Sequence, residues 1–140
     1  MEEPLVQLSP AQRNRLPVFP LPGVWLFPGA LLPLHVFEPR YVEMVEHALA
    51  AADGALAIGT LRPGYEEDYE GRPPVYPLMG AGVILAANDR EDGRYDIVVR
   101  GLERVRLMRE HPPERAFREA MVARHPDHPA PEDPLEGRLR

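Results

Sequence analysis

Short apolar runs alternate with turn residues along most of this chain, and few of the runs are long enough for a helix. The stretch from Leu16 to Tyr41 holds six prolines and two glycines among large apolar residues. Proline inside a helix removes a backbone donor and clashes with the preceding turn, so this stretch cannot form a long helix. Its apolar content is too high for a disordered segment. We therefore expect short strands that end in turns at Pro22-Gly23 and Pro28-Gly29.

Six apolar runs predict strands, over residues 17–21, 31–37, 55–60, 82–87, 95–100 and 103–109. Within residues 31–37, apolar side chains occupy both alternating sets of positions, which predicts a strand buried on both faces. Pro33 cannot donate to a ladder, so it requires an edge or a bulge. Asp92-Gly93 predicts a hairpin turn, and residues 65–77 predict a loop. Segment 113–124 fits both a helical and a strand pattern.

One helix is expected, over residues 40–52. Pro39 suits its first turn, where the missing donor costs nothing, and Gly54 suits its end. One apolar stripe at helical spacing predicts that the helix covers a face of a sheet. The stripe consists of Tyr41, Val45, Ala48, Leu49 and Ala52.

The order LP-x-FPL-x-G-x-x-x-FPG-x-x-LPLH-x-FEPRY in residues 16–41 resembles the opening signature of the Lon amino-terminal domain. That domain is the substrate-recognition module of ATP-dependent Lon proteases, and it also occurs in stand-alone bacterial proteins and in the Lon-like part of cereblon. The matching positions are Phe19, Pro20, Leu21, Phe27, Pro28, Gly29, Leu32, Pro33, Leu34, His35, Phe37, Glu38, Arg40 and Tyr41. The resemblance implies a mainly β (β-rich α+β) fold, a PUA-like pseudobarrel of about six strands with one covering helix. It also favours a strand in segment 113–124.

Three parts are predicted along the chain: a flexible N-terminal lead-in over 1–15, a Lon N-terminal-like β domain over 16–125, and a proline-rich linker over 126–140. Within the linker, Asp133-Pro134-Leu135-Glu136 resembles a helix start. In the family a helical segment usually follows the β domain. The chain is therefore expected to be either a trimmed or a naturally shortened member.

The composition of the chain limits which classes of partner and which cellular locations we expect. The net charge is −6, which argues against nucleic-acid binding through phosphate contacts. There is no cysteine, so disulfides are excluded, and a cytoplasmic location is expected. The first fifteen residues are polar and predict no signal peptide. No apolar run reaches the length of a membrane span, so we expect no membrane contact.

Catalytic residue types are scarce. All sixteen basic residues are arginine, so neither the Ser–Lys dyad nor the P-loop lysine of Lon proteases can exist here. Ser9 and Thr60 are the single hydroxyl residues of their types, and no Ser/His/Asp arrangement is credible. Gly80-Ala81-Gly82 reads as a strand entrance rather than a phosphate loop. The sequence predicts no enzyme and no cofactor.

No metal site is predicted either. His125-Pro126-Asp127-His128 has flanking prolines and no standard ligand spacing, so it reads as a solvated tail. The acidic cluster over 66–70 lacks the spacing of a calcium loop and reads as a charged surface loop.

Several signature residues have structural interpretations. His35 stands between apolar positions and is expected to be a hydrogen-bonded core histidine. Glu38 and Arg40 flank the start of the helix, where a carboxylate favours the N-terminus and an arginine can satisfy carbonyls. The residues assigned to the scaffold in this way are Phe19, Pro20, Pro28, Gly29, His35, Phe37, Glu38, Arg40 and Tyr41.

Four aromatic residues are candidates for partner contact: Trp25, Phe27, Tyr65 and Tyr69. Trp25 lies in a turn and is either a lid on the core or an exposed anchor. Exposed tyrosines favour recognition surfaces, although Tyr65 and Tyr69 could instead pack against the base of their own loop.

The resemblance implies a non-catalytic module that recognises unfolded or extended polypeptide segments, or a protein partner. An apolar peptide would lie on exposed aromatics or pair with an open strand edge. The alternatives are a small-ligand or RNA-binding PUA-like domain and a structural adaptor that docks onto a larger assembly. The oligomeric state stays open, a weak homodimer included.

Overall fold

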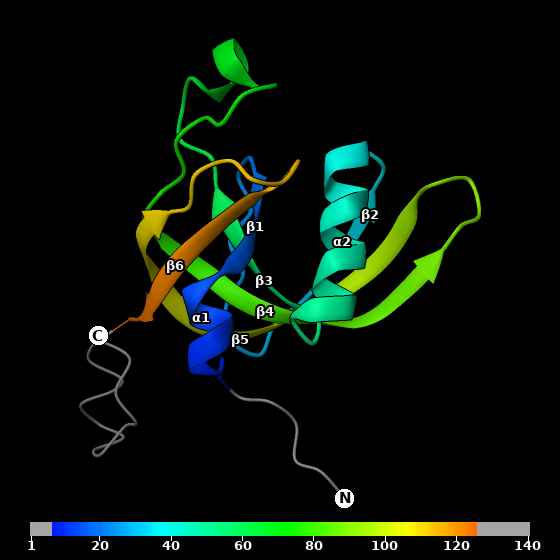
Figure 1. Cartoon of the computed structure of the whole chain (residues 1–140), viewed down its shortest axis with the longest axis horizontal. Helices are drawn as coiled ribbons and strands as arrows, with labels where there is room; N and C mark the ends of the chain where they lie inside the picture. Colours follow the sequence, from blue (N-terminus) through cyan, green and yellow to red (C-terminus); the bar gives the residue numbers. More distant parts are fainter. Residues whose placement is uncertain (1–6, 126–140) are drawn as a thin grey trace, which may run out of the picture.

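The computed structural model describes residues 7–125, which form one mixed sheet with a principal helix (Figure 1). The helical elements are α1 (Pro10–Asn14), α2 (Pro39–Ala51) and a single 3₁₀ turn, η1 (Tyr65–Asp68). The strands are β1 (Leu16–Leu21), β2 (Leu31–Val36), β3 (Ala55–Thr60), β4 (Leu78–Asp89), β5 (Tyr95–Glu110) and β6 (Arg118–Arg124). The predicted fold class, six strands with one covering helix, is confirmed.

The long strand β5 closes the sheet into a barrel. The strand order is β2-β5-β4-β3-β1-β6, and β6 also pairs with β5. Residues 105–110 of β5 pair with β6, whereas residues 95–100 pair with β2. Five strands therefore form a ring, and β2 extends the projecting half of the β4–β5 hairpin as an edge strand. This three-stranded part, referred to below as the wing, lies beside α2 in Figure 1.

Two hydrophobic cores lie on opposite faces of β1 and β3. Phe19 of β1 and Leu56 and Ile58 of β3 belong to the first core, together with the buried face of α2. The intervening residues, Val18 and Ala57 among them, belong to the second. Alternate side chains of a strand point to opposite faces, so these two strands are apolar at consecutive positions. Of the predicted helix stripe, Leu49 is exposed, and Met44 takes its place in the core.

The segment over residues 22–30, here called the crossing segment, passes directly over the backbone of β4 and β5. A Cβ atom at Gly80 would lie 2.1 Å from the Leu26 carbonyl oxygen, and one at Gly101 would lie 2.0 Å from that of Phe27. Gly101 donates to the Ala30 carbonyl and accepts from the Gly29 N–H, each at 2.8 Å. Leu26 is thereby inserted into the first core. These close approaches require glycine at both sheet positions.

Helix α2 begins and ends as the sequence predicts. Pro39 occupies its first turn and Glu38 is the N-cap residue. At the other end the Gly54 N–H donates to the Ala48 carbonyl at 2.7 Å, with φ of +80° at Gly54. A left-handed residue of this kind after the last turn is the usual glycine stop. No helix in residues 7–125 has the length and apolarity needed to span a membrane.

The exposure of β2 contradicts the prediction that both of its faces are buried. Its residues alternate between exposed and half-buried until Val36, because β2 is the terminal strand of the wing and α2 covers one face only. Pro33 lies at this sheet edge, in agreement with the prediction. The runs 82–87, 95–100 and 103–109 are parts of longer strands, and segment 113–124 contributes β6.

Helix α1 lies within the segment that the sequence predicts as a flexible lead-in. Ser9 and Gln12 form a reciprocal capping box, with bonds of 2.8 and 3.1 Å. Leu8 is buried in the second core, and its N–H donates to the Glu103 carboxylate at 2.6 Å. The motif Ser-x-x-Gln was the sequence signal for this helix. The predicted linker, including His128 and the helix start at Asp133, lies outside the described residues.

Replacement of Gly101 by alanine is expected to destabilise the fold by roughly 3 kcal/mol or more, at the upper end of overpacking costs, because the new methyl group collides with the Phe27 carbonyl. The matched control is Gly93→Asn, in the β4–β5 turn. Gly93 has a φ of +83° and no atom within 4 Å of a Cβ, and asparagine tolerates that conformation. Denaturant unfolding of both variants measures the difference. Equal, small losses would show that the crossing segment does not depend on Gly101.

Candidate functional site

Exposed large apolar side chains gather on the segment from Trp25 to Phe37. Trp25 is 47% exposed, Phe27 53%, Leu31 61% and Phe37 58%. Contiguous exposed apolar surface marks interaction sites more often than scattered single residues do. These four side chains come from one stretch of thirteen residues, 25–37, which includes most of the crossing segment and all of β2. This stretch is the first part of the candidate site.

Trp25 is exposed rather than a lid on the core, which were the two positions expected for it. Its ring packs on that of Tyr76, with centroids 5.5 Å apart. The Arg62 guanidinium also lies over the Tyr76 ring, 5.5 Å from its centroid. The adjacent backbone is held in place because the Thr60 hydroxyl donates to the Val24 carbonyl. Trp25 therefore presents an exposed aromatic surface on a fixed base.

Phe27 is also exposed above a fixed backbone. Its carbonyl lies against Gly101, and its ring faces the Arg104 guanidinium at 5.7 Å. Among the described residues no ring contact joins Phe27 or Trp25 to Tyr65 or Tyr69. None joins Trp25 to Phe27 either, so of the four predicted contact residues only Tyr65 and Tyr69 are in ring contact with each other in the described part of the chain.

The two tyrosines form the second group, at η1. Tyr65 is half-buried against the second core, which is the packing alternative considered for it, and its ring lies 6.4 Å from that of Tyr69. Tyr69 is 39% exposed, and its hydroxyl donates to Glu38 Oε1. This hydrogen bond, with burial and the charge of Glu38, raises the pKa of Tyr69 to about 12. Tyr69 is thereby fixed against the start of α2.

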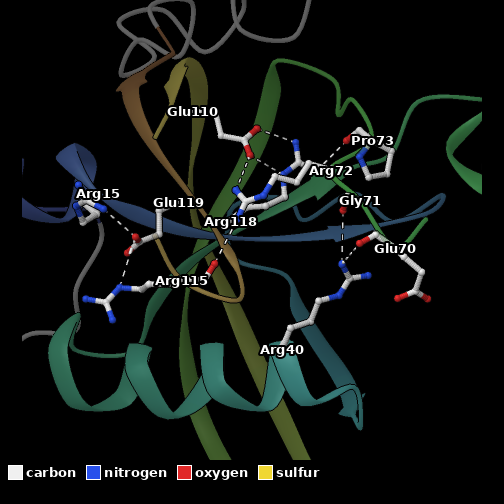
Figure 2. A network of polar contacts seen from close by, with 10 residues as sticks. All are labelled: Arg15, Arg40, Glu70, Gly71, Arg72, Pro73, Glu110, Arg115, Arg118 and Glu119. Carbon is white, nitrogen blue, oxygen red and sulfur yellow. Dashed lines mark hydrogen bonds and ion pairs between the residues drawn. The ribbon is translucent and has the colours of Figure 1, made fainter. Parts of the chain in front are cut away.

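Arg40 attaches the η1 loop to α2. Its guanidinium donates to the Tyr69 carbonyl at 3.1 Å. It also donates to the carbonyls of Glu70 and Gly71 at 3.3 and 3.5 Å (Figure 2). It also lies 4.8 Å from the Tyr41 ring centroid and 5.6 Å from that of Tyr69. These contacts agree with the structural interpretation of Arg40 from the sequence, an arginine that satisfies carbonyls.

The remaining signature residues support the scaffold, with two exceptions, exposed Phe37 and His35. Phe19 packs on Tyr41 in the first core, with ring centroids 4.7 Å apart, and the next residue, Pro20, is also buried. Pro28 is half-buried, and Gly29 after it has a φ of +82°. His35 is not a core histidine. It lies on the exposed face of β2, where its Nδ1 is 2.8 Å from Asp96 Oδ1, because the strand that carries it is at the sheet edge.

The free edge of β2 carries backbone groups that no described strand pairs. The Gly101 N–H donates to the Ala30 carbonyl. In the antiparallel register, the backbone N–H and carbonyl groups of the even-numbered residues of β2 therefore point toward β5. Leu31, Pro33 and His35 therefore direct their backbone groups outwards. Two N–H groups and three carbonyls are available there, since Pro33 has no N–H.

Two hollows adjoin this edge. A shallow groove of about 530 Å³ lies on the wing, lined mainly by small and apolar residues that include Pro33, Ala86 and Val98, with the His35–Asp96 pair at its side. A smaller pocket of about 120 Å³ is lined by residues at the ends of β1 and β2, Leu21 and Phe37 among them, and by Tyr69. The groove could not be anticipated from spacing, because it depends on which face of the wing α2 leaves uncovered.

Arg118 is the centre of a buried ionic network (Figure 2). It makes a bidentate contact with Glu110 at 2.8 and 2.9 Å and donates to the Pro73 carbonyl at 2.7 Å. Arg72 reaches the same carboxylate at 3.2 Å. Burial by itself would raise the pKa of Glu110, but the hydrogen bonds and charges of Arg118 and Arg72 outweigh burial and hold this pKa below its ordinary value. No sequence motif indicated this network.

The described residues supply no metal cluster and no activated nucleophile. No group of three or more His, Asp or Glu side chains in residues 7–125 is arranged to hold a metal ion. Ser9 accepts the capping hydrogen bond of α1, and the Thr60 hydroxyl is buried and donates to a carbonyl. The arrangement is suited to binding, through exposed aromatics and an open strand edge.

Comparison with known proteins identifies consistent relatives. A family model described as the ATP-dependent protease La (LON) substrate-binding domain matches residues 15–140. The chain is 33% identical over 95 residues to Lon protease 2 of Syntrophobacter fumaroxidans, and 30% identical over 93 residues to that of Myxococcus xanthus. These matches cover 67% and 66% of this chain but only 12% and 11% of the relatives.

Two solved structures share the fold. One is the N-terminal domain of the Lon protease of the Mycobacterium avium complex, with a TM-score of 0.64 and 19% identity, over 84% of this chain and 57% of that one. The other is a Lon N-terminal domain protein from Xanthomonas campestris, with a TM-score of 0.65 and 25% identity, over 90% and 69%.

Glu110 is expected to make stability depend on acid pH. Because its folded pKa is lowered, its contribution is fully present above about pH 4.3, where an unfolded glutamate titrates. The contribution is lost as the pH falls through the folded pKa. Glu110→Gln should cost about 2 kcal/mol at pH 7, the size of a lost charge-assisted hydrogen bond. It should also flatten the fall in stability between about pH 5 and pH 3.

Denaturant unfolding at several pH values measures this effect. The matched control is Glu43→Gln, on the exposed side of α2. A wild-type pH slope retained in Glu110→Gln would assign the acid sensitivity to other carboxylates.

Proposed function

The chain belongs to the family of the ATP-dependent protease La (LON) substrate-binding domain, and from that premise we propose that it is a non-catalytic module that binds unfolded or extended polypeptide segments. The observation that carries the proposal is the set of four exposed apolar side chains from Trp25 to Phe37, on a segment whose backbone is hydrogen-bonded to Gly101 of β5. A rigid aromatic surface binds an apolar partner without a large cost of ordering itself.

The open edge of β2 supports an extended conformation for the bound segment. A polypeptide that adds a strand there can accept from the N–H groups of Leu31 and His35 and donate to the carbonyls beside them. Main-chain hydrogen bonds of this kind give affinity for many sequences, as a receptor for unfolded segments requires. The apolar side chains would then be accommodated by the wing groove and by Phe37.

The absence of catalysis is part of the proposal. With no lysine in residues 1–140, the Lon dyad and P-loop cannot be formed within this sequence, so proteolysis would require catalytic residues outside it. The matched part makes up only 12% and 11% of the two Lon proteases, and their activity is not transferred to this chain. A cytoplasmic location, expected from the sequence, belongs to the same proposal.

Trp25→Ala should weaken binding of an unfolded protein about tenfold, the effect of losing roughly 1.4 kcal/mol at an interface anchor, with the melting temperature unchanged because the ring is half exposed. Tyr65→Ala and Tyr69→Ala test the second aromatic group. The probe is reduced, S-carboxyamidomethylated α-lactalbumin, followed by fluorescence anisotropy. Met108→Ala, at another exposed apolar residue, is the control. Equal affinity in Trp25→Ala and Met108→Ala would remove Trp25 from the site.

His35→Pro tests the strand edge. Proline at this outward-facing position removes one free donor without removing a ladder bond, so binding should weaken about fivefold, which corresponds to one net hydrogen bond of about 1 kcal/mol. His35→Ala, which keeps the N–H, is the matched control for the lost side chain. If the two variants bind the same probe equally well, the peptide does not pair with β2.

A further inference from the structure

Three arginine side chains line one small cavity of about 120 Å³ (Figure 2). Arg40 comes from the first turn of α2, Arg72 from the loop after η1, and Arg118 from the start of β6. Tyr41, Gly71 and Phe117 complete most of the wall. Elements far apart in the sequence therefore bring three guanidinium groups to one site in a chain whose net charge is −6.

The three guanidinium groups are held in place before any ligand arrives. Arg118 is only 7% exposed and makes three bonds, two to Glu110 and one to the Pro73 carbonyl. Arg72 donates to Glu110 and to the Arg115 carbonyl. Each guanidinium has five N–H donors. The contacts of Arg118 and Arg72 occupy three and two of them, so donors remain for a further acceptor.

The charges around the cavity do not balance. Glu110 is the carboxylate shared by Arg72 and Arg118. Arg40 reaches the Glu38 carboxylate only at 3.4 Å, and its other bonds go to neutral carbonyls. Glu70 also lines the cavity, but Figure 2 shows its carboxylate directed away from Arg40. Among the residues that line the cavity, three are arginines and one, Glu70, is a carboxylate, so its wall carries an excess of positive charge that favours an anion.

We propose that this cavity binds a carboxylate group of the bound polypeptide. The planar guanidinium fork matches a carboxylate in bidentate geometry. The inference rests on the proposed function, because the small apolar pocket at Phe37 and Tyr69 shares Tyr41 with the arginine cavity as a wall. Arg40, which lines the arginine cavity, lies 4.8 Å from the Tyr41 ring centroid and 5.6 Å from that of Tyr69, and both of these rings line the apolar pocket. A segment that places an apolar side chain beside a carboxylate would fill both.

Four labelled decapeptides of one apolar sequence test the proposal by fluorescence anisotropy at low salt. The first has a free C-terminal carboxylate and the second a C-terminal amide. The third and fourth are amides that carry glutamate or glutamine as the penultimate residue. The free acid, the glutamate amide or both should bind about tenfold tighter than the uncharged peptides, a difference of about 1.4 kcal/mol, because only the charged peptides form charge-assisted hydrogen bonds with the guanidinium groups. Tighter binding of the free acid alone identifies a chain end as the source of the carboxylate.

The variant Arg72→Gln tests whether the preference for carboxylate-bearing peptides arises at the arginine cavity. Arg72 is the least buried of the three, and its replacement should reduce the preference for the acidic peptides to less than twofold while leaving the uncharged peptides unaffected. Arg106→Gln, at an exposed arginine on β5 outside the cavity, should retain the preference. Equal binding of acid and amide by the wild-type protein overturns the carboxylate site but leaves the proposed function standing. A preference unchanged in Arg72→Gln overturns its location, and no binding of any peptide contradicts the proposed function itself.

Discussion

The structure depends on the close approach of the crossing segment to Gly80 and Gly101. Neither position can accept a side chain, because a Cβ atom at either one would lie within 2.1 Å of a carbonyl oxygen of the crossing segment. This contact inserts Leu26 into the first core, sets the start of β2 on β5, and leaves Trp25 and Phe27 outside. The same constraint therefore determines both the attachment of β2 to β5 and the exposure of the aromatic side chains.

Much of the fold could be predicted from the sequence because its signals are local. The prolines of residues 16–41 excluded a helix there, Gly54 indicated the end of α2, and Pro33 indicated a sheet edge, each through its own backbone geometry. Burial could not be predicted in the same way. His35 and Leu31 alternate with apolar residues as core positions do, yet they face outwards, because only the tertiary order of strands shows that β2 is terminal.

The candidate site could be anticipated only in part, because burial was again left open. Trp25 and Tyr69 were candidates for partner contact with a packed position as the alternative for each, and both side chains are exposed. The arginine network escaped prediction because Arg40, Arg72 and Arg118 are separated by up to 78 positions and share no spacing pattern. Buried arginines require partners, and here Glu110 and a set of loop carbonyls supply them. These bonds also fix the η1 loop, so the charges that could bind a carboxylate are the ones that position Tyr69.

The central claim is that a rigid face, which includes the crossing segment, β2 and the η1 loop, binds extended polypeptide. Backbone amide shifts of the ¹⁵N-labelled protein, recorded during titration with an unfolded polypeptide, test it most directly. The account predicts that residues 24–37 and 65–72 shift, while the amides of α1 stay in place. Shifts centred on α1, or none at saturating polypeptide, would contradict it.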